Sequence, residues 1–157
     1  MAEKEEQKLE IRKMTKRDEQ LLFNIALRAF SADAEKYGSY PPLLDLLKKR
    51  FSLPLLFGHV LLVEGTIIGG LFALPFIGKG ELGAIFLDPA YWGKDYGGQA
   101  LKALEELYPK VREWRLKTPA ESPALHRFYE KHGYKEVARK TDRTSGIGCI
   151  VYEKTIK

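Results

Sequence analysis

Cysteine is almost absent from this sequence, because Cys149 is the only one among 157 residues. A single cysteine cannot form a disulfide within the chain, and it cannot supply the thiolates of a cysteine-rich zinc site. We expect Cys149 to be a small buried apolar residue, not a nucleophile. A chain of this length can bury a core without disulfides or metals, which favours an ordinary globular protein.

Long hydrophobic runs are also missing. The longest ones, residues 53–63 and 66–78, are too short and too interrupted to span a membrane. The first eight residues are charged and no hydrophobic segment follows them, so we expect no secretory signal. These absences predict a cytoplasmic protein with no membrane partner and a disordered tail at residues 1–7.

Charge of one sign is not concentrated anywhere. The chain has 26 basic and 21 acidic residues, a net charge of +5, and its longest basic run is Lys48-Lys49-Arg50. Nucleic-acid binding requires basic residues gathered on one face, ideally with stacking aromatic residues between them. We therefore expect no nucleic-acid partner, whereas a modest positive charge suits an anionic ligand.

The order of apolar patterns indicates one α/β domain spanning residues 1–157, since no repeat or linker divides the chain. Strands are predicted at residues 9–14, 59–63, 66–76, 81–87, 111–117, 134–139 and 148–155. Helices are predicted after Thr15, at 43–51, from about Gly98 to Pro109, and at 123–132. The strand at 148–155 is interpreted as a sheet edge that could support a homodimer.

Glycines and polar residues give finer predictions. Thr15 followed by Asp18 resembles a capping box at a helix start. Glu64-Gly65 joins two β-rich runs as a hairpin, and Gly69-Gly70 marks a bulge or a close approach of another backbone. Gly78-Lys79-Gly80 is interpreted as the turn before the next strand.

The stretch from Glu81 to Leu107 organises the rest of the chain. Its pattern predicts a buried strand that ends before Pro89, then a glycine-rich bend, then a helix with an apolar face. Gly93, Gly97 and Gly98 allow positive φ angles and the close approach of a ligand to the backbone. A helix entered through such a bend directs N–H groups and the positive end of its dipole at one point, which predicts a phosphate site.

Two motifs in the second half resemble those of the GNAT superfamily of N-acetyltransferases. Residues 87–101, Leu-Asp-Pro-Ala-Tyr-Trp-Gly-Lys-Asp-Tyr-Gly-Gly-Gln-Ala-Leu, resemble the acetyl-CoA motif, and their Tyr-Trp-Gly-Lys portion resembles the branch that acetylates ribosomal protein N-termini. Residues 114–119 and 126–134, which include Phe128-Tyr129-Glu130-Lys131, resemble the second motif. Trp92 stands where the family usually has glutamine or arginine, and Asp95 stands where it has glycine. A carboxylate at Asp95 should weaken cofactor binding.

The resemblance implies a fold and a cofactor site. The fold would be a mixed, mostly antiparallel sheet of six to seven strands flanked by about four helices and splayed between the fourth and fifth strands. Acetyl-CoA would be the cosubstrate, with no metal. Ser122 replaces an asparagine of the second motif and would keep its capping function. The cofactor-binding residues implied are Ile85, Phe86, Leu87, Trp92, Gly93, Lys94, Asp95, Tyr96, Gly97, Gly98, Ser122 and Tyr129.

The same resemblance suggests two catalytic residues. Tyr129 matches a tyrosine that acts as general acid toward the cofactor sulfur, although a core tyrosine on an apolar helix face is the alternative. Glu81 resembles a general base, and a solvent-facing residue beside Gly80 is the alternative. Catalysis would proceed by direct attack of a primary amine.

The acceptor could be a small-molecule amine, a peptide or protein N-terminus, or a lysine. The resemblance directs attention to the first helices and to residues 142–146, and Asp33 with aromatic neighbours would suit a cationic amine. The candidate substrate-binding residues are Phe30, Asp33, Tyr37 and Tyr40, with Pro41 beside them. Packing of this loop against the sheet is the alternative role. The competing function for the whole chain is a non-catalytic acyl-CoA-binding or sensing module.

Overall fold

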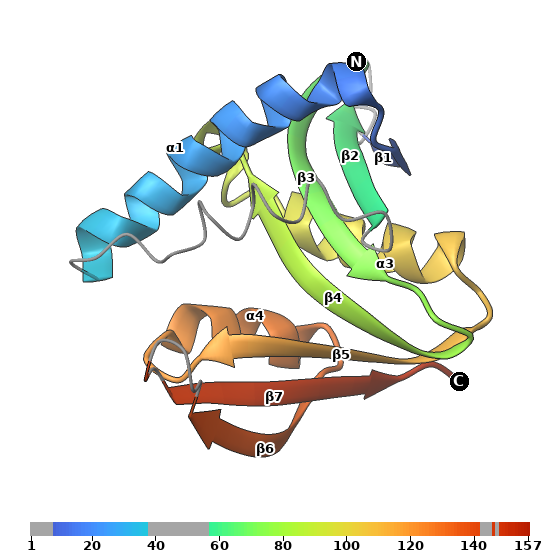
Figure 1. The fold of residues 1–157 in the computed structure, drawn as a ribbon, viewed down its shortest axis with the longest axis vertical. Coiled ribbons are helices and arrows are strands. Elements are labelled where there is room, and N and C mark those ends of the chain that lie inside the picture. Colours follow the sequence, from blue (N-terminus) through green and yellow to red (C-terminus); the bar gives the residue numbers. More distant parts are fainter. Residues whose placement is uncertain (1–7, 38–56, 142–145, 147) are drawn as a thin grey trace, which may run out of the picture. The chain divides into compact units, whose positions relative to one another are not determined.

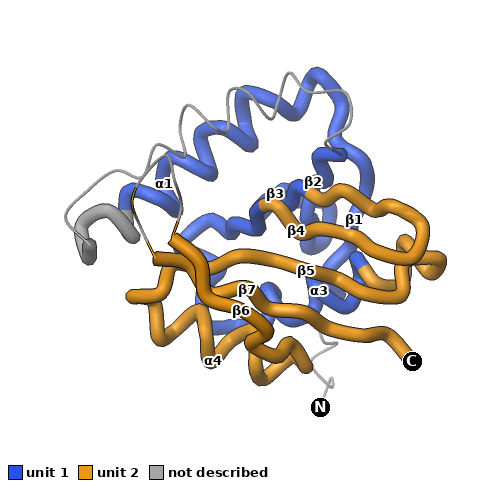
Figure 2. Tube along the Cα trace, turned by 60° about the horizontal axis from the view of Figure 1, so that its bottom comes forward, with its two compact units in different colours: residues 1–72, 84–104 blue, residues 73–83, 105–157 orange. Residues whose placement is uncertain are grey.

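The computed structural model of the chain describes residues 8–37, 57–141, 146 and 148–157. The predicted tail at 1–7 and the predicted helix at 43–51 lie outside the described residues. The chain divides into two compact units, one made of residues 1–72 and 84–104 and the other of residues 73–83 and 105–157 (Figure 2). We call them unit 1 and unit 2.

The described elements form a mixed α/β fold of strands and helices (Figure 1). The sheet of the described residues has seven strands, in agreement with the six to seven that the family resemblance implied, and their order is β1-β2-β3-β4-β5-β7-β6. The elements are β1 (Leu9–Lys13), a 3-10 turn (Lys16–Asp18), α1 (Glu19–Tyr37), β2 (Phe57–Val63), β3 (Thr66–Leu74), β4 (Gly78–Leu87), a second 3-10 turn (Pro89–Tyr91), α3 (Tyr96–Leu107), β5 (Val111–Pro119), α4 (Pro123–Lys131), β6 (Lys135–Thr141) and β7 (Gly148–Thr155). Among the described helices, none is long and apolar enough to cross a membrane.

One pair of neighbouring strands runs parallel. Gly78–Glu81 at the start of β4 pairs with the first half of β5, whereas β5 with β7, β6 with β7 and β1 with β2 are antiparallel. The pairing of β4 with β5 stops at Glu81, although β4 continues to Leu87. This is the predicted splay between the fourth and fifth strands.

Two strand predictions were wrong. The strand at 148–155 is not a sheet edge, because β7 pairs with β5 on one side and β6 on the other. The homodimer edge inferred from it therefore has no basis in the sheet order. Gly78-Lys79-Gly80 is not a turn but the beginning of β4. A Cβ at Gly80 would lie 2.8 Å from the Trp114 ring, so that glycine marks a close approach within the sheet.

Unit 1 buries both faces of its strands. Val60 of β2 joins one apolar cluster with Phe72, Phe86 and the inward face of α1. Its neighbour Leu61 joins a second cluster with residues of β1, β3 and α3. Because consecutive strand residues point to opposite faces, α1 covers one face of these strands and α3 the other. This arrangement holds the end of β4 and the start of α3 in one unit.

The predicted hairpin and close approach are confirmed in unit 1. Glu64 and Gly65 have φ angles of 51° and 78° between β2 and β3, as a two-residue turn of this type requires. At Gly69, a Cβ would lie 2.2 Å from the carbonyl oxygen of Phe86. No residue larger than glycine fits there without separating β3 from β4.

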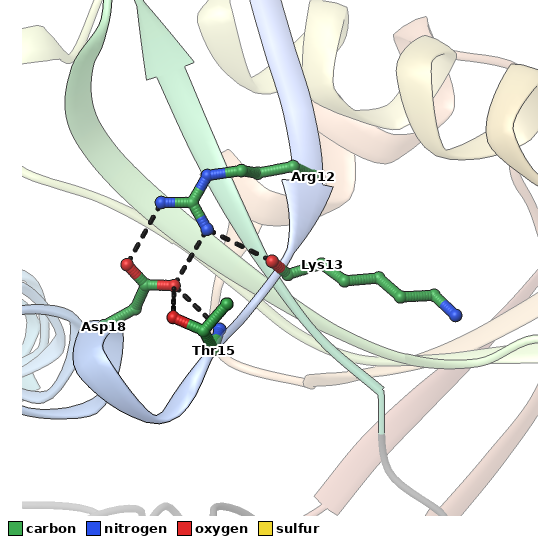
Figure 3. A network of polar contacts seen from close by, with 4 residues as sticks. All are labelled: Arg12, Lys13, Thr15 and Asp18. Carbon is green, nitrogen blue, oxygen red and sulfur yellow. Dashed lines mark hydrogen bonds and ion pairs between the residues drawn. The ribbon is translucent and has the colours of Figure 1, made fainter.

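A polar network joins β1 to the beginning of α1 (Figure 3). The Asp18 carboxylate accepts the Thr15 N–H at 2.7 Å, as the capping-box pattern predicted, and it also pairs with both terminal nitrogens of Arg12 at 2.8 and 3.0 Å. The hydrogen bonds from Arg12, followed by those from Thr15, outweigh the effect of burial and lower the pKa of Asp18 well below its usual range. Asp18 is therefore an ionised, buried anchor for the first helix.

Unit 2 has a core rich in aromatic residues. Trp114 of β5 and Tyr152 of β7 are buried together with aliphatic residues of both strands. The Tyr129 ring of α4 lies 6.3 Å from the Tyr152 ring and 5.6 Å from the Tyr134 ring. α4 is thus attached to the sheet of its unit mainly through aromatic contacts.

Candidate active site

The chain leaves β4 through a tightly bonded turn. The Asp88 N–H donates to the Ile68 carbonyl of β3 at 2.7 Å, and the Asp88 carboxylate accepts the Ala90 N–H at 3.2 Å. Arg28 of α1 pairs with the same carboxylate at 2.7 Å. Partial burial acts to raise the pKa of Asp88, but the hydrogen bonds from Arg28 and Ala90 outweigh it and lower the pKa. An ionised Asp88 therefore fixes the exit of β4 to both β3 and α1.

The glycines of the bend between this turn and α3 have different backbone conformations. Gly93 has a φ of 77° and Asp95 a φ of 63°, whereas Gly97 and Gly98 are not among the residues with positive φ. α3 begins at Tyr96 rather than at Gly98, because the Asp95 carbonyl already accepts the Gln99 N–H at 3.1 Å. Gly97 and Gly98 are therefore ordinary residues of the first helical turn. Aspartate tolerates the left-handed region better than most residues, which explains how it replaces a glycine here.

The bend offers several N–H groups to a ligand. Within the part of the chain that the structure describes, the N–H groups of Gly93, Lys94, Gly97 and Gly98 donate no hydrogen bond. Those of Gly97 and Gly98 lie at the positive end of the α3 dipole. Gly93 and Lys94 are exposed, and Gly97 is half-buried. These residues fit a phosphate-bearing group such as the pyrophosphate of coenzyme A.

Charged side chains at the bend have mixed effects on an anion. Asp95 is exposed and directly precedes the first residue of α3, so its negative charge is unfavourable for a phosphate bound at the bend. Lys94 is also exposed, and its Nζ lies 5.7 Å from the centre of the Tyr91 ring. Tyr96 is buried and packs into the apolar cluster of α3 and the strands, so its ring serves the core.

The three β4 residues assigned to the cofactor arm have different surroundings. Phe86 is buried, with its ring 6.2 Å from both Phe30 and Phe72 and its carbonyl oxygen against Gly69. Ile85 and Leu87 are half-buried and pack on the cluster that includes α3. The Leu87 carbonyl accepts the indole N–H of Trp92 at 2.9 Å. Phe86 is thus committed to the core of unit 1.

Tyr129 lies in unit 2, in a cluster of rings. Its ring is 5.0 Å from that of Phe128 in an edge-on arrangement and also contacts Tyr134 and Tyr152. Burial raises the pKa of the Tyr129 phenol above its ordinary value. Tyr129 is therefore a neutral phenol held among aromatic rings.

The helix that carries Tyr129 begins as predicted, with one difference. Ser122 stands at the N-cap, Pro123 at the first helical position, and Gly133 beyond the end has a φ of 94°. The Ser122 side chain is buried and makes no capping hydrogen bond, so it does not keep the function expected of it. His126 instead holds the helix start, with its Nε2 2.9 Å from the Pro119 carbonyl oxygen.

Glu81 is exposed at the last paired position of β4, opposite Arg115 of β5. Arg115 donates to the Glu153 carboxylate of β7 at 2.8 Å. Both neighbours are in unit 2, so Glu81 borders a charged strip on that unit. This position suits either of the two expected roles of Glu81, a general base that acts through water or a solvent-facing surface residue.

The residues assigned to the acceptor are only partly described. Phe30 is half-buried against the core of unit 1. Asp33 and Tyr37 lie within α1, and only their backbone is described. Tyr40, Pro41 and residues 142–145 lie outside the described residues.

A shallow pocket of about 220 Å³ in unit 2 lies where β6 ends and β7 begins. Cys149 borders it and is half-buried, which is less than the burial expected from the sequence. The lining residues are Ala120, Arg139, Lys140, Thr141, Gly148 and Cys149. In the described ranges, no three His, Cys, Asp or Glu side chains are grouped so that they could hold a metal ion.

Two contacts of the site were not predicted from the sequence. The Arg28–Asp88 pair joins residues 60 positions apart, so no pattern within one segment predicts it. The Trp92–Leu87 hydrogen bond was also missed, although tryptophan at a position usually occupied by glutamine or arginine was a visible departure.

The bend thus lies between β4 of a mixed sheet and the N-terminus of α3, with N–H groups that meet no acceptor in the described chain. The sequence profile of the acetyltransferase (GNAT) family matches residues 20–134. This chain belongs to that family. No curated protein matches it in sequence.

Solved structures share the fold over nearly the whole chain. The ribosomal-protein-S18-alanine N-acetyltransferase from Escherichia coli has a TM-score of 0.75 at 17% identity, covering 95% of this chain and 94% of that one. PaiA N-acetyltransferase from Thermoplasma acidophilum, in complex with coenzyme A, has a TM-score of 0.67 at 24% identity, covering 94% and 98%. AAC(6')-Ib in complex with paromomycin and acetyl-CoA has a TM-score of 0.74 at 19% identity, covering 94% and 93%. At these identities the likeness shows the fold.

Proposed function

We propose that this protein is an acetyl-CoA-dependent N-acetyltransferase that acetylates a primary amine. The observation that carries the proposal is the bend before α3, where Gly93, Lys94, Gly97 and Gly98 offer N–H groups that meet no acceptor in the described chain. Membership of the acetyltransferase (GNAT) family and the fold shared with a coenzyme A complex support it.

Acetyl-CoA would supply an activated acetyl group as a thioester. The four N–H groups of the bend would hold its pyrophosphate, aided by the α3 dipole. A backbone N–H near Ile85 or Leu87 would polarise the thioester oxygen, which is stabilisation of the oxyanion type. Phe86 would support this strand from the core rather than contact the ligand.

We assign the general acid to Tyr129, which would donate its proton to the departing thiolate. Its raised pKa keeps the phenol protonated through neutral pH, and its ring contacts fix the side chain. Tyr129→Phe should lower kcat at least tenfold and leave the Kd for acetyl-CoA within twofold. Tyr134→Phe removes another buried hydroxyl from the same cluster and is the matched control. An equal loss of kcat in both variants would contradict the assignment.

The acceptor class stays broad. Glu81 is the carboxylate we assign as base for the amine, directly or through water. The neighbouring structures include enzymes named for a protein N-terminal alanine and for spermidine. We therefore propose a small-molecule amine, a peptide or protein N-terminus, or a lysine as acceptor, with Asp33 and aromatic residues of the α1 region favouring a cationic one.

The exposed Asp95 at the bend favours one second candidate, a module that binds or senses acyl-CoA without catalysis. Calorimetry with acetyl-CoA, followed by a thiol-release screen over amines, separates the two. An enzyme binds acetyl-CoA and releases coenzyme A with a suitable amine, and a sensor binds without release. Absence of binding to any acyl-CoA would refute both.

A further inference from the structure

The Trp92 side chain makes a hydrogen bond back to the end of β4. Its indole Nε1–H donates to the Leu87 carbonyl at 2.9 Å, five residues earlier in the chain. The side chain is nevertheless 45% exposed, so the contact lies at the surface beside the bend. A large aromatic residue at such a position needs a reason other than burial.

The hydrogen bonds around Trp92 show where the rigid part of the loop ends. The Trp92 N–H donates to the Pro89 carbonyl at 3.2 Å, and the Tyr91 N–H donates to the Asp88 carbonyl at 2.8 Å. With the contacts of Asp88 to β3 and Arg28, the chain is bonded at nearly every step from Leu87 to Trp92. In the next two residues, Gly93 and Lys94, the N–H groups meet no acceptor within the described chain. Trp92 is therefore the last fixed residue before the groups assigned to the pyrophosphate.

The backbone conformation changes between Trp92 and Gly93, so a side-chain hydrogen bond at Trp92 adds to the hold that its backbone bond provides. Trp92 itself is extended, with φ −71° and ψ 153°, and Gly93 follows with a φ of 77°. Glycine has wide conformational freedom, so a bend that starts at Gly93 can swing unless the preceding residue is held. A backbone bond to Pro89 and a side-chain bond to Leu87 hold Trp92 at two points.

We propose that Trp92 is a positioning residue, whose indole bond to the Leu87 carbonyl sets the direction in which the Gly93 and Lys94 N–H groups face an acyl-CoA. This inference rests on the proposed function and adds to it a side chain that acts on the ligand through the backbone. The bond acts by pre-organisation, since a ligand that meets an ordered loop does not bear the cost of ordering it.

The experiment measures the Kd for acetyl-CoA and the thermal midpoint of unfolding in three proteins. Trp92→Phe keeps an aromatic ring and removes the N–H donor. Ile77→Ala is the control, because that side chain is 84% exposed and Ile77 is not one of the candidate catalytic, cofactor-binding or substrate-binding residues. The loss of one neutral hydrogen bond from an ordered loop should raise Kd about three- to tenfold in Trp92→Phe, with unchanged Kd in Ile77→Ala. A lower thermal midpoint with an unchanged Kd would show a merely structural role and overturn the inference.

A second measurement tests the contact without ligand. The chain has two tryptophans, so an amide-correlation NMR spectrum should show two indole N–H signals, and Trp92→Phe identifies one. The Trp92 indole proton should exchange with solvent at least tenfold more slowly than that of a free indole despite its exposure. Exchange at the free rate would overturn the inference, whatever the affinity. Wild-type protein that binds no acyl-CoA would refute the proposed function as well, whereas wild-type binding with equal Kd in Trp92→Phe would overturn the role of Trp92 alone.

Discussion

Replacing Asp95 by asparagine should strengthen acetyl-CoA binding while slightly destabilising the protein. Asparagine keeps the size of the side chain and tolerates the φ of 63° that Asp95 adopts, so the shape of the bend should persist. The substitution removes the negative charge of the bend and keeps a side-chain oxygen that can accept a hydrogen bond. The two effects have opposite signs, which separates electrostatics at the site from a general change in the fold.

The magnitude follows from the exposed position of the carboxylate. Two charges about 6 Å apart in water interact by about 0.7 kcal/mol, and a pyrophosphate carries about two charges, so the repulsion is about 1.4 kcal/mol before screening. Salt at physiological strength reduces this value, and the Kd of the variant should fall about three- to tenfold. Loss of a negative charge at the N-terminus of α3 should cost about 0.5 kcal/mol of folding stability.

Calorimetry at low and high salt measures the first effect, and chemical denaturation measures the second. Glu64→Gln is the matched control, because Glu64 is the other non-glycine residue with positive φ in the described chain and lies in the β2–β3 turn. The gain in affinity should shrink as salt increases. An Asp95→Asn variant with equal or weaker affinity at low salt would refute the view that this carboxylate opposes the ligand.

Three further changes test the fold and the chemistry. Asp18→Asn should cost about 1–2 kcal/mol of folding stability at pH 7. Because the pKa of Asp18 is lowered in the folded state, the stability that its carboxylate contributes in the wild type is lost as pH falls below about 4. Denaturation experiments at acid pH should therefore show a weaker pH dependence in the variant. Equal acid sensitivity would contradict this. Gly69→Ala should cost about 3 kcal/mol by thermal denaturation, since its Cβ would meet the Phe86 carbonyl; a loss below about 1 kcal/mol would mean that β3 and β4 separate easily. Glu81→Gln should slow turnover by more than about tenfold at unchanged Kd for acetyl-CoA, and an unaltered rate would leave Glu81 a surface residue.

Local patterns predicted the elements of this fold well, and they failed where the answer depends on partners distant in sequence. A run of β-forming residues predicted β2, and helical spacing predicted α3, because both signals lie within one segment of the chain. The place of β7 in the sheet depends on which strands flank it, and its own sequence carries no such information. Gly80 was taken for a turn residue because its reason, the Trp114 ring of β5, lies more than thirty positions away.

The candidate site shows the same division. The glycine-rich bend and its helix were predicted from adjacent residues. Of the three glycines that allow a positive φ there, Gly93 adopts one and Gly97 and Gly98 do not, because a glycine permits that conformation without requiring it. The side-chain bonds of Arg28 and Trp92 could not be predicted, since each depends on where the end of β4 lies in space.

The two departures from the family motif, Trp92 and Asp95, stand at opposite ends of the same bend. Trp92 fixes its beginning through the Leu87 carbonyl, and the Asp95 carbonyl fixes its end through the first hydrogen bond of α3. Between them, the N–H groups of Gly93 and Lys94 meet no acceptor in the described chain, which is what an anionic ligand requires. The departures therefore change the charge of the bend and leave its backbone suited to phosphate. The N–H groups of Gly97 and Gly98, in the first turn of α3, are the ones that side-chain caps usually bond, and in the described chain they also meet no acceptor.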